Sequence, residues 1–243
     1  LSQAQNPQNI GEDISADKTY GQLEDVTIVD TLNIRNNATV TILGGFNVNE
    51  GVTLTIEGGS ELIIDSAVAS MIVDGKIVVE EGAKLTVKNA KDVKISGTLE
   101  SEGIVNIKST VTVKTDGKIL ADETETASFN VSKGLTIEAG AELEVRSVFS
   151  ATEGISNKGL VILNGASIAS EVKINMAADS AVVEVRNFIS TNDAAKITVT
   201  DMGMELAKNV PKVGTEDANS VILTAKNQYG FKGLIITESI VKK

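Results

Sequence analysis

Carboxylates are the only abundant side chains in this sequence with acid–base or metal-binding chemistry. The 243 residues include 33 Asp and Glu but no His and no Cys. The absence of His removes the commonest general base and transition-metal ligand, and the absence of Cys removes thiolate nucleophiles and sulfur-bound zinc. Any catalytic or metal site would therefore have to be built mainly from oxygen ligands.

The acidic residues gather at a few places, of which Asp122-Glu-Thr-Glu125 is the densest. Calcium takes six to eight oxygen ligands, so Asp122, Glu123 and Glu125 are the candidate calcium ligands, although no EF-hand pattern surrounds them. The other acidic pairs are Glu12–Asp13, Glu80–Glu81 and Glu216–Asp217. A glycosidase needs two carboxyl groups about 5–10 Å apart across a cleft, and nothing in the sequence marks a cleft. We therefore expect no catalytic residue, no enzyme activity and no cofactor other than calcium.

One segment that combines Glu and Arg occurs twice. Residues 141–153 and 181–193 align at an offset of 40, with identities that include Glu144/Glu184, Val145/Val185 and Arg146/Arg186. Side chains alternate along a strand, so if the valines point inward the flanking Glu and Arg point outward together. We expect a solvated Glu/Arg ladder rather than a catalytic or sugar-binding group.

Two triplets match the N-glycosylation pattern, Asn37-Ala-Thr39 and Asn130-Val-Ser132. Glycosylation requires export and a surface position. Asn37 follows Asn36 in a predicted turn and is the better candidate, whereas Asn130 adjoins Phe129 and falls in a predicted strand.

Composition excludes several classes of partner. The formal net charge is −11 and only Arg35, Arg146 and Arg186 are arginines, which argues against nucleic acid, because phosphate contacts dominate that affinity. No apolar run approaches the roughly 18–20 residues of a membrane-spanning helix. The chain begins with the polar stretch Leu1-Ser-Gln-Ala-Gln, which we interpret as a mature N-terminus left by removal of a targeting segment; a fragment of a longer protein would begin in the same way.

A repeated pattern of glycine turns and short apolar strands must position these residues. Gly51-Val-Thr-Leu-Thr-Ile56, Gly82-Ala-Lys-Leu-Thr-Val87 and Gly140-Ala-Glu-Leu-Glu-Val145 each place apolar residues two apart, which is strand period. Gly59 and Gly82 lie 23 residues apart, and Gly140 and Gly165 lie 25 apart. These distances suit single coils of a repeat architecture, in which each unit buries its apolar face against its neighbours.

The pattern predicts an all-β, single-domain parallel β-helix, or β-solenoid, that is right-handed and has terminal caps. The alternative is one or two antiparallel β-sandwiches, because Asn-Gly and Asp-Gly turns also close hairpins. Strands with only two or three alternating apolar positions are short for a sandwich. A core almost free of aromatic residues, which make up 3% of the chain, also favours a narrow solenoid.

Three regions are expected along the chain. Residues 1–20 form a polar N-terminal arm or cap, 21–195 the solenoid, and 196–243 a C-terminal cap or assembly edge. Within the last region, Asp201–Asn209 suggests a short helix, and Val221–Thr224 and Leu234–Val241 suggest strands. The arm from Leu1 to Asp13 is the first candidate for a segment exchanged between subunits, and Leu234–Val241 for the receiving or donated strand.

The segments Gly51–Leu62 and Glu81–Val87 resemble β-helical repeats of microbial cell-surface proteins, namely surface-layer, sheath and adhesin-like proteins of bacteria and archaea. The resemblance covers about Val26 to Ile189 and carries over no functional residue. It implies an exported structural protein that assembles with copies of itself into an extracellular filament, sheath or surface layer. Adhesin rods are usually much longer than this chain.

Two other functions stay open at this stage. One is a carbohydrate-binding adhesin module at the cell surface, with envelope polysaccharide as its partner, although ring platforms for sugars are scarce. The other is a polysaccharide lyase or hydrolase, which the missing His disfavours.

Overall fold

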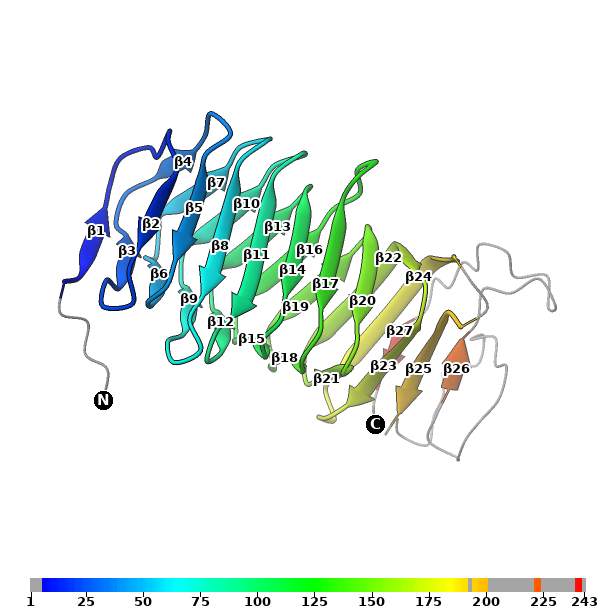
Figure 1. Ribbon diagram of the computed structural model, residues 1–243. Helices are drawn as coiled ribbons and strands as arrows, with labels where there is room; N and C mark the ends of the chain where they lie inside the picture. The colour runs from blue at the N-terminus through cyan, green and yellow to red at the C-terminus, as the bar shows by residue number, and fades with distance from the viewer. Residues whose placement is uncertain (1–5, 192–193, 201–220, 224–238, 242–243) are drawn as a thin grey trace.

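Short β-strands wind around a common axis to form a solenoid of about nine turns (Figure 1). The computed structural model describes residues 6–191, 194–200, 221–223 and 239–241, and every regular element within them is a strand. The predicted β-solenoid is therefore confirmed. The antiparallel sandwich is wrong, because all strand pairs between residues 8 and 200 are parallel, as in β3–β6 and β11–β14.

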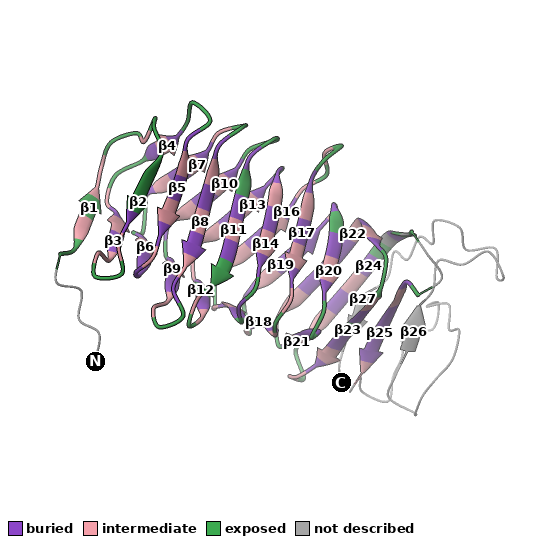
Figure 2. Ribbon diagram, viewed as in Figure 1, coloured by how far each residue is buried: buried purple, intermediate pink, exposed green. Residues whose placement is uncertain are grey.

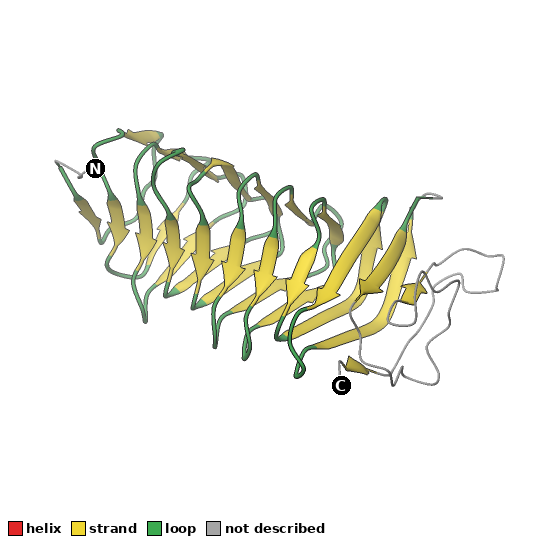
Figure 3. Ribbon diagram, turned by 90° about the horizontal axis from the view of Figure 1, so that it is seen from below, coloured by secondary structure: helices red, strands yellow, loops and turns green. Residues whose placement is uncertain are grey.

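The strands stack into three ladders, which we name face 1, face 2 and face 3 (Figures 1 and 3). Face 1 contains β1 (Gln8–Ile10), β3 (Val26–Ile28), β6 (Phe46–Val48), β9 (Met71–Val73), β12 (Val93–Ile95), β15 (Val111–Val113), β18 (Leu135–Ile137), β21 (Ile155–Asn157), β23 (Glu171–Met176), β25 (Lys196–Thr200) and β26 (Val221–Leu223). Face 2 contains β4 (Leu32–Ile34), β7 (Thr53–Ile56), β10 (Lys76–Val79), β13 (Thr98–Ser101), β16 (Lys118–Ala121) and β19 (Glu142–Val145). Face 3 contains β2 (Lys18–Tyr20), β5 (Thr39–Ile42), β8 (Glu61–Asp65), β11 (Lys84–Asn89), β14 (Ile104–Ile107), β17 (Ser128–Val131) and β20 (Val148–Ala151).

Two long strands pass from face 2 onto face 3. They are β22 (Leu160–Ile168) and β24 (Val182–Ser190), and their first halves continue the ladder of β19 while their second halves continue that of β20. The last strand, β27 (Ser239–Val241), pairs with the first half of β24. Turn length varies, since Val93 pairs with Val111, 18 residues on, and Phe46 with Met71, 25 residues on.

Alternation between buried and half-exposed residues produces the solenoid interior (Figure 2). In β7, Leu54 and Ile56 are fully buried, while Thr53 and Thr55 face outward. The parallel register then places Leu54 beside Ile77 of the next turn. Each aliphatic side chain buried in this way stabilises the fold by roughly 1.5–3 kcal/mol.

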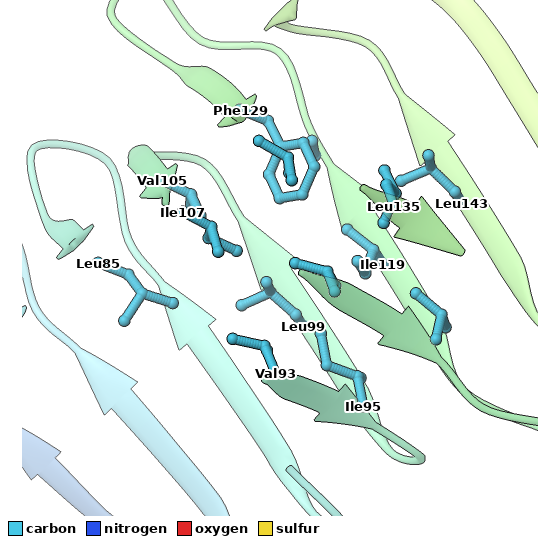
Figure 4. Close-up of a cluster of buried hydrophobic side chains, with 14 of the residues drawn as sticks. Leu85, Val93, Ile95, Leu99, Val105, Ile107, Ile119, Phe129, Leu135 and Leu143 are labelled. Atoms are coloured by element: carbon cyan, nitrogen blue, oxygen red, sulfur yellow. The ribbon is translucent and has the colours of Figure 1, made fainter. Parts of the chain in front are cut away.

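Aliphatic residues fill the narrow interior from all three faces. Figure 4 shows Val93, Leu99 and Val105, from faces 1, 2 and 3, directed into the same space. Aromatic packing is limited; Phe129 and Phe149 stack in adjacent turns with ring centroids 6.1 Å apart. The low aromatic content seen in the sequence follows from this width, because most positions accommodate only Val, Ile, Leu or Ala.

Glycines allow the corners of successive turns to approach closely. Gly59 and Gly82 both have positive φ, and the Gly59 amide donates to the Gly82 carbonyl at 3.0 Å, which confirms their predicted one-turn spacing. The matching prediction for Gly140 and Gly165 is wrong. Gly140 lies in the corner before β19, whereas Gly165 lies inside β22 where that strand bends from face 2 to face 3. Glycine occurs at both kinds of corner, so its spacing alone does not define a turn.

Strand pairing continues across residues 20 and 195, the two expected boundaries. Residues 8–20 form the first turn of the stack, because β1 pairs with β3, Ile14 bridges Ile34, and β2 pairs with β5. At the other end, β25 extends face 1 beyond residue 195 through its pairing with β23. Strands occur at 221–223 and 239–241 as expected, while the expected helix at 201–209 lies outside the described residues.

Candidate assembly interface

The first turn presents backbone groups that face away from the rest of the molecule. In β1, the Gln8 amide donates to Asp25 and the Ile10 carbonyl accepts from Val29, so the even-numbered residues bond to β3. Alternate residues of a parallel strand bond to opposite neighbours. The amide and carbonyl of Asn9 therefore point outward, as do those of Thr19 in β2, since the Tyr20 carbonyl is bonded to Leu43 of the second turn. In the part of the chain that the structure describes, β1 and β2 have no second strand partner.

An open hollow of about 740 Å³ lies at this end of the solenoid. Ile10 and Ile14, which are half-buried against the core, and the buried Tyr20 supply its apolar surface. Four carboxylates and one ammonium group accompany them, from Glu12, Asp13, Asp17, Asp30 and Lys18. Carboxylates therefore surround the opening of the hollow, and the last apolar layer of the solenoid interior forms its floor.

Two of the rim aspartates also hold the first turn to the second. The Asp13 carboxylate accepts from the backbone amide of Asn33 at 2.8 Å, and the Asp17 carboxylate accepts from that of Thr39 at 2.9 Å. Asp13 is also 3.4 Å from the Arg35 guanidinium. These two side chains thus bond to backbone amides in strands β4 and β5 of the second turn.

Tyr20 closes the interior at this end. It is only 6% exposed, and the Lys18 ammonium lies 5.4 Å from its ring centroid. Burial raises the pKa of the Tyr20 hydroxyl above its ordinary value of 10.0, and the Glu24 carboxylate raises it further. The protonated phenol is thus favoured by the folded first turn.

The opposite end of the solenoid ends in antiparallel rather than parallel strand pairs. On face 1, β26 pairs antiparallel with β25, and on face 2, β27 pairs antiparallel with β24. The outer edges of the last parallel strands on these two faces are therefore occupied by returning segments of the same chain. Antiparallel pairing ends a ladder that would otherwise add a further parallel turn.

A cluster of charged side chains lies near this second end. Glu171 of β23 accepts from the Thr198 hydroxyl at 2.7 Å and lies 3.4 Å from the Lys196 ammonium. Burial on its own would raise the pKa of Glu171, but the Thr198 hydrogen bond and the charges of Lys196 and Lys173 together hold that pKa below its ordinary value of 4.5. The group ties β23 to β25, the last two parallel strands of face 1.

The repeated Glu/Arg segment has the predicted spacing but not the predicted environment. Glu142 pairs with Leu160 and Leu160 with Val182, so the offset of 40 is two turns. Glu144 is buried, at 6% exposed, and forms an ion pair with Arg146. The expectation of a solvated ladder is therefore wrong at Glu144, because the intervening turn places the apolar Ile162 between the two Glu/Arg pairs instead of a third charged residue.

The calcium candidates lie in the corner between β16 and β17. The Asp122 carboxylate accepts from the backbone amide of Glu123 and lies 3.5 Å from the Arg146 guanidinium, while Glu123 and Glu125 are exposed. Within the described ranges no three Asp or Glu side chains are grouped so that they could hold a metal ion. The structure thus does not bring the three candidates together, and calcium binding at this corner stays a prediction.

The two glycosylation candidates differ in accessibility. Asn37 is exposed in a turn with φ of 58°, as the sequence indicated. Asn130 is on strand β17, where its amide donates to Asn106 at 3.0 Å and its carbonyl oxygen accepts from Ser150 at 2.7 Å. Asn37 is therefore solvent-exposed, with its side-chain oxygen close to Gly59 of the next turn, whereas the side-chain amide of Asn130 is hydrogen-bonded to side chains of the two adjacent turns.

Sequence reasoning treated residues 1–20 as a polar arm or cap, with Leu1–Asp13 as a candidate joining segment, but it missed that residues 8–20 form a turn of the strand stack. Ile10, Ile14 and Tyr20 were the available signal, since each occupies the position of a buried residue in the next turn. It also missed Asn157, a fully buried residue that donates to the Val182 carbonyl and accepts from the Gly159 amide. Asn157 occupies an inward position of face 1 next to the corner leading to β22.

Comparison of the chain with protein-family models, curated proteins and solved structures finds no match. Among the described residues, no helix has the length and apolar character needed to cross a membrane.

Proposed function

We propose that this protein is an exported structural subunit that assembles with copies of itself into an extracellular filament, sheath or surface layer. The observation that carries the proposal is the first turn, where the backbone groups of Asn9 and Thr19 face outward beside a hollow with an apolar floor. Strand edges of this kind are templates for pairing with another chain.

The body of the molecule suits a load-bearing role. Parallel ladders connect every turn to the next, and ion pairs such as Lys76–Glu100 and Lys114–Glu138 join side chains of adjacent turns. Each such exposed pair contributes at most about 1 kcal/mol, so the ladders and the buried core supply the stiffness.

The acidic composition sets the conditions under which such a polymer would form. A net charge of −11 makes like subunits repel each other, and divalent cations or added salt screen that repulsion. Asn37 lies exposed in the corner between β4 and β5, where an exported chain would be accessible to N-glycosylation.

Negative-stain electron microscopy of the purified protein, with and without millimolar calcium, tests the proposal. The expected result is ordered filaments, tubes or lattices in at least one condition. Dispersed single rods in both conditions, at high protein concentration, would contradict it.

A carbohydrate-binding surface module is the second candidate, and a polar ladder on face 3 favours it. Asn106, Asn130 and Ser150 from three successive turns are joined by hydrogen bonds and present amide and hydroxyl groups at a regular spacing. However, every aromatic residue whose burial the structure describes is inside: Tyr20, Phe46, Phe129, Phe149 and Phe188. A glycan array with no bound sugar would remove this candidate.

A further inference from the structure

We infer that face 3 between β14 and β24 is a lateral contact surface, which packs against the same surface of a second copy and joins filaments side by side. The inference rests on the proposed function and adds to it a second contact, separate from the open edge of the first turn.

Large and small side chains alternate from turn to turn along this surface. Five outward-facing residues follow one another in the parallel register and form what we name the ridge row: Ile104, Ser128, Val148, Ser167 and Ile189. They come from β14, β17, β20 and the second halves of β22 and β24 (Figure 1). Val148 and Ile189 are half exposed, at 50% and 52%. Aliphatic ridges therefore alternate with serine notches, one turn apart.

This alternation makes the ridge row complementary to itself. If a second copy faces the first with its solenoid axis reversed, a two-fold axis between β20 and β22 places Val148 of each copy opposite Ser167 of the other. The same rotation places Ile189 of each copy opposite Ser128 of the other. Aliphatic side chains then fill the space above serines, as side chains of two packed sheets do. The contact is isologous, because both copies use the same surface.

A second row of outward residues lies beside the ridge row and is already hydrogen-bonded. The Asn130 amide donates to Asn106 at 3.0 Å, and the Ser150 hydroxyl donates to the Asn130 side-chain oxygen at 2.7 Å. Burying a polar group costs less when another protein group satisfies it. Covering this row with a second copy is therefore less costly than covering isolated amides.

Charge also favours a contact between copies here. None of the eight residues of the two rows is charged, although the chain carries a net charge of −11. Like-charged molecules repel least where the facing surfaces are uncharged. In the same register toward the first turn, the ridge row is followed by Lys84 and Glu61, so the uncharged surface is bounded.

Face 1 is also uncharged over several turns, but it lacks ridges. Strands β15 and β18 each have one outward residue, Thr112 and Thr136, and neither strand has an exposed large apolar side chain. The self-complementary pattern therefore distinguishes face 3.

The size of the surface suits contacts between filaments. At a strand spacing of about 4.8 Å, the five strand segments form a strip roughly 20 Å long. A stable interface buries about 800 Å² on each partner, which is more than this strip provides. Subunits in a filament present the strip repeatedly, so contacts that are weak between free subunits add together.

Substitutions that change the fit of the ridge row test the contact. Val148→Ser removes a ridge, Ser167→Val fills a notch, and the double variant exchanges the two. Val68→Ser is the matched control, because Val68 is 69% exposed in the corner between β8 and β9, outside the surface. Pairing of free subunits is measured by sedimentation equilibrium at millimolar concentration, and bundling of filaments by electron microscopy. Thermal melting checks that each variant is folded.

Each single variant is expected to weaken pairing about tenfold and to leave filaments unbundled, because a ridge is lost or a notch is blocked. The double variant should restore both, and Val68→Ser should behave like the unaltered protein. Ser167→Val is the most informative variant, because it adds apolar surface and would strengthen a non-specific hydrophobic contact. Added salt should strengthen pairing, because it screens the exposed Glu123 and Glu125 at the corner before β17.

The outcomes separate this inference from the proposed function. If the unaltered protein forms filaments that never bundle, or Ser167→Val pairs more strongly, the lateral contact is wrong and self-assembly into filaments stands. If free subunits pair and respond to the substitutions as expected but form no polymer, the lateral contact stands and the proposed polymer fails. Sugar binding on a glycan array that Val148→Ser abolishes, in subunits that do not pair, would assign the surface to carbohydrate and overturn the inference.

Discussion

The first turn and the central turns are built from the same short strands, but they differ in what lies on either side. A central strand such as β11 pairs with β8 below and β14 above, whereas β1 pairs only with β3 among the described residues. Some central corners also approach each other closely; a Cβ on Gly97 would overlap the backbone carbonyl of Gly75. The difference teaches that one repeated pattern gives both central strands paired on two sides and, in the described part of the chain, an end strand paired on one side.

The two ends differ as well. Among the described residues, β1 and β2 each have one edge without a strand partner, while the last parallel strands of faces 1 and 2 are paired with antiparallel segments of the same chain.

The largest effect is expected from glycine substitutions in the central turns. Gly97→Ala places a methyl group against backbone that cannot move without displacing the neighbouring turn, and should lower the free energy of unfolding by about 3 kcal/mol or more. Gly11→Ala in the first turn meets only the Asp30 carboxylate, 2.7 Å away at the end of a flexible side chain, and should cost less than about 1 kcal/mol. Urea denaturation measures both values.

Gly134→Ala is the matched control for this comparison. Gly134 lies in a central turn, but a Cβ there would have no atom within 4 Å. The substitution should leave stability unchanged or raise it slightly, because Ala has less conformational freedom than Gly in the unfolded chain. Equal losses of unfolding free energy for the substitutions at residues 97, 11 and 134 would show that Gly97 is no more closely packed against its neighbouring turn than the other two glycines.

A smaller effect on the free energy of unfolding is expected in alkaline solution, from Tyr20 in the first turn. Because the pKa of Tyr20 is raised in the folded state, its contribution to stability is fully present below pH 10.0 and is lost as the pH rises through the folded pKa. The free energy of unfolding should therefore fall above about pH 10. Tyr20→Phe should remove this part of the pH dependence.

Ultraviolet titration in a Tyr229→Phe background isolates the Tyr20 phenol, because the chain has only two tyrosines. An ordinary tyrosine titration curve for Tyr20 would contradict the burial described for the first turn.

The smallest effect on stability is expected in acidic solution, at Glu171 near the β25–β26 end of the solenoid. The pKa of Glu171 is lowered in the folded state, so its contribution is present above pH 4.5 and is lost as the pH falls through the folded pKa. Thr198→Val removes one hydrogen bond to this carboxylate and should move its titration toward the ordinary value, as measured by NMR. An unchanged titration would mean that the lysines alone set the pKa of Glu171.

The sequence predicts the central strands of the solenoid well, because the pattern that indicates each strand lies within a few neighbouring residues. Leu54 and Ile56 lie two residues apart between Gly51 and Gly59, and that pattern alone indicates a strand with one buried side. The handedness of the coil stays a prediction.

The ends were not predictable in the same way, because their structure depends on contacts between distant residues. Ile10 and Ile14 read as isolated apolar residues in a polar stretch, and only their pairing with Ile28 and Ile34 shows that they continue the core. The buried role of Asn157 depends on Val182, 25 residues away, and has no local pattern. The candidate interface is therefore defined by the direction of backbone groups and by the burial of side chains, not by a sequence motif.

The central claim is that the open edge of the first turn joins subunits, and a substitution at Asn9 tests it most directly. Asn9→Pro removes an amide that faces away from β3, so the first turn keeps its own hydrogen bonds while its outer edge loses a donor. Asn9→Ala is the control, because it removes the side chain and keeps the amide. We predict that electron microscopy shows filaments for the unaltered protein and for Asn9→Ala, and few or none for Asn9→Pro at equal thermal stability. Filaments of equal length and number in all three would contradict the claim.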